Sequence, residues 1–137
     1  MAMSTFLTEI KNRIVALGIS GYTATEVFRT EMPNSPNKII TLYRYPGNAP
    51  ELGFGFTGLQ YEHPGLKIVV RGEPTDADGP EAVMNSIYRD LATVQDVVLG
   101  ATRYLMIRPN QQPFLDARDG NKRIHWSCNF ICDREAN

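Results

Sequence analysis

Apolar residues repeat at helical spacing in two parts of the chain. In residues 4–17 they recur at intervals of four, four and three, which places them on one helical face: Phe6, Ile10, Ile14 and Leu17. A second stripe in residues 80–97 has the same character: Val83, Ile87, Leu91, Val94 and Val98. Asp78 stands at the position of an N-cap for this segment, and Glu81 follows three residues later, as in a capping box. The pattern predicts two amphipathic helices, each with one buried face.

Residues 123–133 alternate instead of repeating at helical spacing. One set is apolar or sulfur-bearing: Ile124, Trp126, Cys128, Phe130 and Cys132. The other set is polar: Arg123, His125, Ser127, Asn129 and Asp133. Alternation of this kind is typical of a strand with one face on a core and the other in water. Asp119-Gly120 precedes the strand and indicates a tight turn, since glycine reaches positive φ without a steric penalty.

Segments rich in β-branched and aromatic residues predict four further strands, near residues 24–29, 38–44, 66–71 and 102–108. The simplest arrangement of these elements packs two helices on one face of a mixed, mostly antiparallel β-sheet, in the α/β (α+β) class. A chain of 137 residues with ordinary composition is expected to form a single domain, 1–137.

Residues 45–65 interrupt this pattern. They contain five glycines and three prolines, together with the aromatic residues Tyr45, Phe54, Phe56 and Tyr61. Structureless loops of this length are uncommon in compact domains, and disordered segments are poor in aromatic residues. We therefore expect a long Gly/Pro/aromatic loop or arm that packs elsewhere, for example on a neighbouring subunit. The alternative is a wide surface loop packed on itself.

Composition and charge limit the partners and the cellular compartment that we expect for the protein. Fourteen basic and fifteen acidic residues give a formal net charge of −1, which argues against a broad nucleic-acid-binding face. Glu9, Lys11 and Arg13 interrupt the N-terminal segment where a secretory signal would be apolar, and no apolar run has the length of a membrane span. Two cysteines are compatible with a reducing compartment. We expect a protein made in the cytosol, without a membrane partner.

His125, Cys128 and Cys132 carry side chains that bind zinc, so a metal site is the first hypothesis for this stretch. On a strand, however, His125 faces away from Cys128, and Cys128 lies roughly 13 Å from Cys132 at about 3.3 Å per residue. Disulfide-linked Cα atoms lie within about 7 Å of each other. Strand geometry therefore predicts two core cysteines, with no metal site and no disulfide.

Two other motifs resemble sites of chemistry. Residues 53–58 read Gly-Phe-Gly-Phe-Thr-Gly, which fits the dinucleotide-binding pattern but does not lie between a strand and a helix. Glu62-His63 pairs an acid with a base, but no nucleophile stands in a recognisable context. The sequence therefore predicts no catalytic residue and no cofactor. A small cytosolic ligand-binding or hydrolytic protein acting through His63 or His125 is the alternative.

Three blocks of the chain resemble one protein family. Residues 64–72 read PGLKIVVRG, a helical segment follows at 81–98, and PFLDARDGNKR at 113–123 is followed by Asn129-Phe130. These blocks resemble the tail-terminator, or tail-completion, family of tailed-bacteriophage minor capsid proteins. Asp116-Ala117 stands where that family often has Leu-Gly.

The resemblance implies a structural virion protein of the tail and neck, and no enzyme. It implies a closed homohexameric ring at the head-proximal end of the tail tube, which stops tube polymerisation and joins the tail to the head connector. The implied partners are further copies of the chain, the tail-tube protein and a neck protein. The ring would contact nucleic acid only as DNA that passes through its lumen, without sequence-specific binding. Assembly would take place in the host cytoplasm, and a head–tail connector or neck subunit is the alternative in the same setting.

Five residues are expected at the partner or oligomer interface of such a ring: Leu52, Phe54, Phe56, Arg71 and Arg123. The apolar three lie in the 45–65 segment, and exposed apolar side chains anchor interfaces. Arginine is suited to ion pairs between subunits. Arg71 and Arg103 could instead be charged residues at strand ends that face solvent and contact no other subunit.

Overall fold

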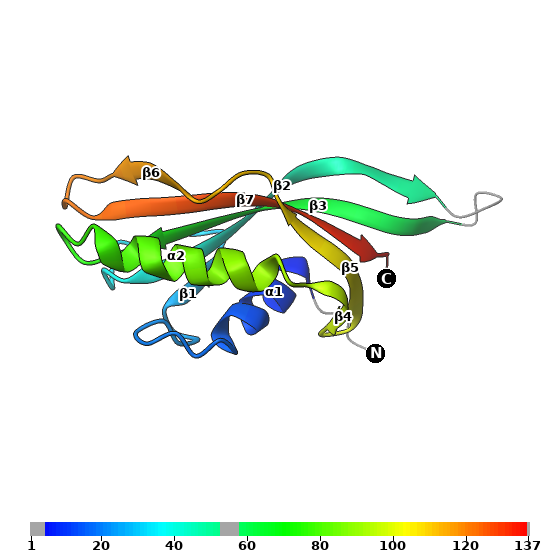
Figure 1. Cartoon of the computed structure of the whole chain (residues 1–137), viewed down its shortest axis with the longest axis horizontal. Helices are drawn as coiled ribbons and strands as arrows, with labels where there is room; N and C mark the ends of the chain where they lie inside the picture. Colours follow the sequence, from blue (N-terminus) through cyan, green and yellow to red (C-terminus); the bar gives the residue numbers. More distant parts are fainter. Residues whose placement is uncertain (1–4, 53–57, 137) are drawn as a thin grey trace.

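A computed structural model describes residues 5–52 and 58–136 (Figure 1). The described elements are α1 (Phe6–Val15), β1 (Val27–Arg29), β2 (Ile39–Leu52), β3 (Leu59–Arg71), α2 (Asp78–Leu91), β4 (Gln95–Leu99), β5 (Thr102–Pro109), β6 (Phe114–Arg118) and β7 (Ile124–Glu135). The strands form one sheet in the order β1-β2-β3-β7-β5-β4, and β6 pairs with β7 off this path. All neighbours are antiparallel except β1 and β2, which are parallel. No helix of the described residues is both long and apolar enough to cross a membrane.

Both helices cover the same face of the sheet, and the main core lies between them and the central strands (Figure 1). Alternate residues of β2, β3 and β7 supply the sheet side of this core: Ile40, Leu42, Leu66, Ile68, Val70, Cys128, Phe130 and Cys132. The helices contribute the other side: Phe6, Ile10, Ile14, Met84, Ile87 and Leu91. The predicted α+β architecture, with two helices on one face of a mixed sheet, is confirmed.

Strand β7 alternates as its sequence predicts, but its polar face is less wet than expected. Ser127 is fully buried, and Asp133 is 8% exposed. Ser127 donates a hydrogen bond to Asp116 of β6, and Arg108 of β5 donates two to Asp133. Side chains of the neighbouring strands therefore take the place of water on this face.

The boundaries of α2 differ from the prediction. The helix ends earlier, and β4 begins where the last helical turn was expected, because the valine-rich segment pairs with β5. Val94 still reaches the core, whereas Val98 is 65% exposed on the strand. At the start of the helix, Asp76 rather than Asp78 accepts a hydrogen bond from the N–H of Gly79, at 3.0 Å.

Residues 45–52 and 59–65 form the two strands of a β-hairpin rather than a loop. Strand β2 continues to Leu52 and β3 begins at Leu59, so most of this segment is paired strand. The pairing shifts register three times between Tyr45 and Leu52. Such bulges accommodate the glycines and prolines that obscured the strand pattern in the sequence.

Glu9 of α1 is a charged residue in the core. Its side chain is fully buried and forms an ion pair with Arg134 of β7, at 3.4 Å between Oε1 and Nη1. Thr102 and Tyr104 of β5 each donate a hydrogen bond of 2.8 Å to its carboxylate. Burial, together with the bond to Glu9, raises the pKa of Tyr104 well above its usual range. The Arg134 guanidinium lies 5.1 Å from the centre of the Phe6 ring, so the network joins α1 to two strands of the sheet.

The turn before β7 is organised by the carboxylate of Asp119. It accepts hydrogen bonds from the backbone N–H groups of Asn121 and Arg123, from the Arg123 guanidinium at 2.9 Å and from His125 at 3.1 Å. Although burial acts in the opposite direction, the bonds from His125, the backbone and Arg123 hold the pKa of Asp119 well below its usual range. The positive φ of this turn belongs to Lys122, at 62°, and not to the glycine as predicted.

Replacing Asp119 with asparagine is expected to lower the free energy of unfolding by about 2 kcal/mol at pH 7, since a charged acceptor of several hydrogen bonds is lost. A carboxyl group with a depressed folded-state pKa stabilises the fold above its unfolded pKa of about 3.9, and this contribution disappears as the pH falls through the folded-state pKa. The difference between wild type and Asp119→Asn should therefore shrink below about pH 4. Denaturant unfolding followed by circular dichroism measures this stability difference. An equal difference at pH 2 and pH 7 would contradict the stabilising role of the ionised Asp119 carboxylate.

Candidate assembly interface

The outer half of the β2–β3 hairpin is largely exposed, above all along β2. We call residues 44–52 and 59–65 the arm. Strand β1 pairs with β2 only at residues 40–42, so within residues 5–52 and 58–136 no strand pairs with the outer edge of the arm. Figure 1 shows both strands of the arm reaching past the ends of β5 and β7. The arm is therefore available to a partner that the single chain does not supply.

Two glycines allow the strands of the arm to cross closely. A Cβ atom at position 47 would lie 1.8 Å from the carbonyl oxygen of His63, which is a backbone clash. A Cβ atom at position 65 would lie 2.4 Å from the ring of Tyr45. Gly47 and Gly65 are thus required by the approach of neighbouring backbone and ring atoms.

His63 holds the base of the arm to the rest of the sheet. Its Nδ1 lies 2.6 Å from Asp133 of β7, and its Nε2 lies 3.0 Å from Glu51 on the other strand of the hairpin. Asp133 also accepts two hydrogen bonds from Arg108, at 2.9 and 3.1 Å. The four side chains form a clamp that joins both strands of the arm to β5 and β7.

Tyr45 provides a second attachment. Its hydroxyl donates a hydrogen bond to the carbonyl of Phe130, at 3.1 Å, and accepts one from Asn110. Burial raises the pKa of Tyr45, and the bond from Asn110 offsets part of that shift. The Tyr45 attachment lies at the inner end of the arm and the His63 attachment about midway along it, so the position of the outer end follows from the pairing of the arm's own strands and of β3 with β7.

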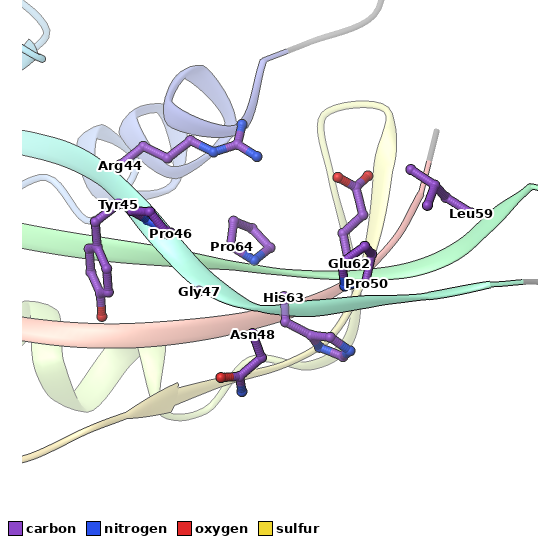
Figure 2. A pocket seen from close by; sticks show the side chains of 10 residues that line it. All are labelled: Arg44, Tyr45, Pro46, Gly47, Asn48, Pro50, Leu59, Glu62, His63 and Pro64. Carbon is purple, nitrogen blue, oxygen red and sulfur yellow. The ribbon is translucent and has the colours of Figure 1, made fainter.

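A hollow of about 430 Å³ lies along the arm. Figure 2 shows that its lining side chains project to opposite sides of the hairpin: Arg44, Glu62 and Pro64 on one side, and Tyr45, Asn48 and His63 on the other. Catalysis by acid and base requires groups that converge on one reacting atom. The hollow is therefore better described as part of a curved surface than as a substrate pocket.

Leu52 and Leu59 lie opposite each other at the outer end of the described arm. They are 54% and 53% exposed, so together they form a small apolar end on the arm. The predicted interface residues Phe54 and Phe56 lie outside the described residues. Of the apolar residues singled out in the sequence, Leu52 is thus placed on an exposed apolar end, and Leu59 joins it.

Arg71 and Arg123 lie inside the chain, 2% and 4% exposed. Arg71 donates hydrogen bonds to the carbonyls of Asn37 and Pro36, at 2.9 and 2.6 Å, and Arg123 donates to the carbonyl of Asn34, at 2.6 Å. Burial and the neighbouring Arg123 lower the pKa of Arg71. Both arginines hold the loop before β2 against the sheet, and their part in a subunit contact stays a prediction.

Arg103 lies between two carboxylates of its own chain, Asp96 and Glu135. Its side chain is 39% exposed, and exposed ion pairs contribute little to stability. This geometry agrees with the second interpretation of Arg103, a charged residue at a strand end that faces solvent.

His125 and the two cysteines do not come together. His125 bonds to Asp119 on one face of β7, whereas Cys128 and Cys132 are buried in the core on the other, and both are free. Burial raises the pKa of the Cys128 thiol to about 12. Within residues 5–52 and 58–136, no three His, Cys, Asp or Glu side chains are grouped as metal ligands.

Sequence reasoning missed Leu59 and the clamp around His63. Apolar residues on both sides of a glycine-rich segment are a hairpin signal, and this signal would have identified Leu52 and Leu59 as neighbours. The clamp carries no local signal, because Glu51, Asp133 and Arg108 are brought together only by strand pairing.

Comparison with known proteins identifies the family. No curated protein matches the chain at a significant level. The fold is similar to a chain from a solved structure described as the virion of a native gene transfer agent particle, with a TM-score of 0.62 and 16% identity over 90% of this chain and 84% of that chain. Identity this low supports the fold alone. The sequence profile of the bacteriophage tail terminator proteins matches residues 9–136, nearly the whole chain, which confirms the resemblance found in the sequence. The protein therefore belongs to the family of bacteriophage tail terminator proteins.

Proposed function

We propose that the protein forms a closed ring at the head-proximal end of the phage tail tube, where it stops tube polymerisation and joins the tail to the head connector. As a member of its family, the protein is a structural component of a phage tail. The observation that supports the ring most directly is the arm, whose outer end exposes two apolar side chains beyond the body of the fold. Apolar ends of this kind are typical of surfaces that assemble.

The proposed mechanism is geometric. A contact between two different surfaces of one chain repeats from copy to copy, and it closes into a ring when the rotation between copies divides a full turn. A ring seated on the last layer of a tube would terminate growth because its far face differs from the face that adds tube subunits. Such a mechanism uses no reacting group, in agreement with the divergent side chains around the hollow.

Light scattering of the purified protein, alone and mixed with the tail-tube protein of its phage, tests the proposal. We expect a species with the mass of six chains, free or on tube ends, and tubes of limited length by electron microscopy. Tubes assembled without the protein should grow to a wide range of lengths. A protein that stays monomeric beside growing tubes of unchanged length would contradict the proposal.

The same experiment separates the other functions. A neck or connector subunit would bind the head connector and leave tube length unchanged. A ligand-binding or hydrolytic protein would assemble with neither partner.

A further inference from the structure

A second exposed apolar residue lies at the end of the molecule opposite the arm. Leu115 of β6 is 60% exposed. Register with β7 places Leu115 opposite Trp126 and Arg118 opposite Ile124, so Leu115 and Arg118 project from the same face of the sheet. We call Leu115, Arg118 and the turn residue Lys122 the β6 patch.

The arm and the β6 patch are complementary in charge as well as in apolar character. Beyond Arg44 at its inner end, the arm contains Glu51 and Glu62 and no lysine or arginine. Glu51 bonds to His63, whereas Glu62 projects to the same side of the hairpin as Leu59 (Figure 2). In the β6 patch, Arg118 and Lys122 are exposed, and neither forms an ion pair with any residue in the described part of the chain. An apolar centre with charges around it is the usual anatomy of a protein interface.

The positions of the two surfaces exclude a contact within one chain. Strand β6 lies beside the part of β7 that pairs with residues 69–71 of β3, whereas the arm ends at Leu59. About ten residues of strand separate them, roughly 33 Å at 3.3 Å per residue. Figure 1 shows β6 and the arm at opposite ends of the sheet. A contact between them must join two copies head to tail.

Side chains rather than backbone would make this contact. The outer edge of the arm contains Pro46 and Pro50, which have no N–H to offer to an added strand. Proline at a sheet edge discourages strand addition.

We propose that the arm of one copy docks on the β6 patch of the next, with Leu52 and Leu59 against Leu115 and with Glu62 near Arg118 and Lys122. The occupant of the β6 patch is thus a second copy of this chain. This inference rests on the proposed function, because it identifies the surfaces through which the ring would close.

Cysteine cross-linking tests the contact in the full-length protein. Both native cysteines are fully buried, so introduced surface cysteines would dominate the reaction. A mixture of Leu52→Cys chains with Leu115→Cys chains, incubated with tail-tube protein and oxidised gently, should give covalent heterodimers. Each variant alone should give none, and a chain with both substitutions should give a ladder that ends at the closed ring. Val98→Cys, 65% exposed on β4, replaces Leu115→Cys in the control mixture and should give no heterodimer.

Charge reversal provides a second measurement. Adding Arg118→Glu to the Leu115→Cys chain should reduce the heterodimer yield at least about tenfold, because like charges would then face each other. Rings that form by light scattering without these heterodimers, or that link Leu52→Cys chains to one another, would overturn the inference and leave the proposed function standing. A protein that never assembles, alone or with tubes, would overturn both.

Discussion

Replacing Glu9 with alanine should lower the free energy of unfolding by about 3–5 kcal/mol, which is a large part of the roughly 5–15 kcal/mol that stabilises a typical domain. Its carboxylate is fully buried, and its removal leaves the charge of Arg134 in the core without a partner. The hydroxyls of Thr102 and Tyr104 lose the carboxylate to which they donate at the same time. Thermal and denaturant unfolding of the purified chain measure the loss.

Two variants separate the charge from the packing around Glu9. Glu31 is exposed, and Glu31→Ala should change the free energy of unfolding by less than about 0.5 kcal/mol. Combining Glu9→Met with Arg134→Met removes both charges and should recover much of the stability, because a buried ion pair replaced by apolar residues is often neutral. If Glu9→Ala is no more harmful than Glu31→Ala, the buried network does not hold α1 to the sheet.

Replacing both Leu52 and Leu59 with serine should weaken assembly at least about tenfold while the fold stays intact. Both side chains are more than half exposed in the single chain, so folding gains little from them. If an interface buries these two side chains, replacing each of them with a polar one should cost roughly 1–2 kcal/mol of association free energy. Light scattering and tube-length distributions measure assembly, and circular dichroism with thermal unfolding measures the fold.

Val98→Ser is the matched control, because Val98 is equally exposed but lies on β4, away from the arm. It should leave both assembly and fold unchanged. Equal loss of stability and assembly in the Leu52→Ser, Leu59→Ser variant would make these leucines part of the folded core. Unchanged assembly would exclude the outer end of the arm from the interface.

Patterns that act over a few residues were predictable from the sequence. The stripes of α1 and α2 and the alternation of β7 are local consequences of backbone geometry, and they placed Phe6, Ile87 and Phe130 correctly in the core. The same alternation correctly placed His125 and Cys128 on opposite faces of the strand. The blocks around residues 64–72 and 113–123 identified the family.

The sequence by itself determined the two helices, the core strand β7, the α+β class and the tail terminator family, because these depend on period and on short motifs. Tertiary structure alone decided that residues 44–52 and 59–65 form a paired arm, since a bulged strand has no fixed period. It also decided that Glu9 meets Arg134, that Arg71 and Arg123 hold a loop, and that Leu52 and Leu115 lie at opposite ends. Each of these facts depends on pairing between residues distant in sequence, which no local pattern records.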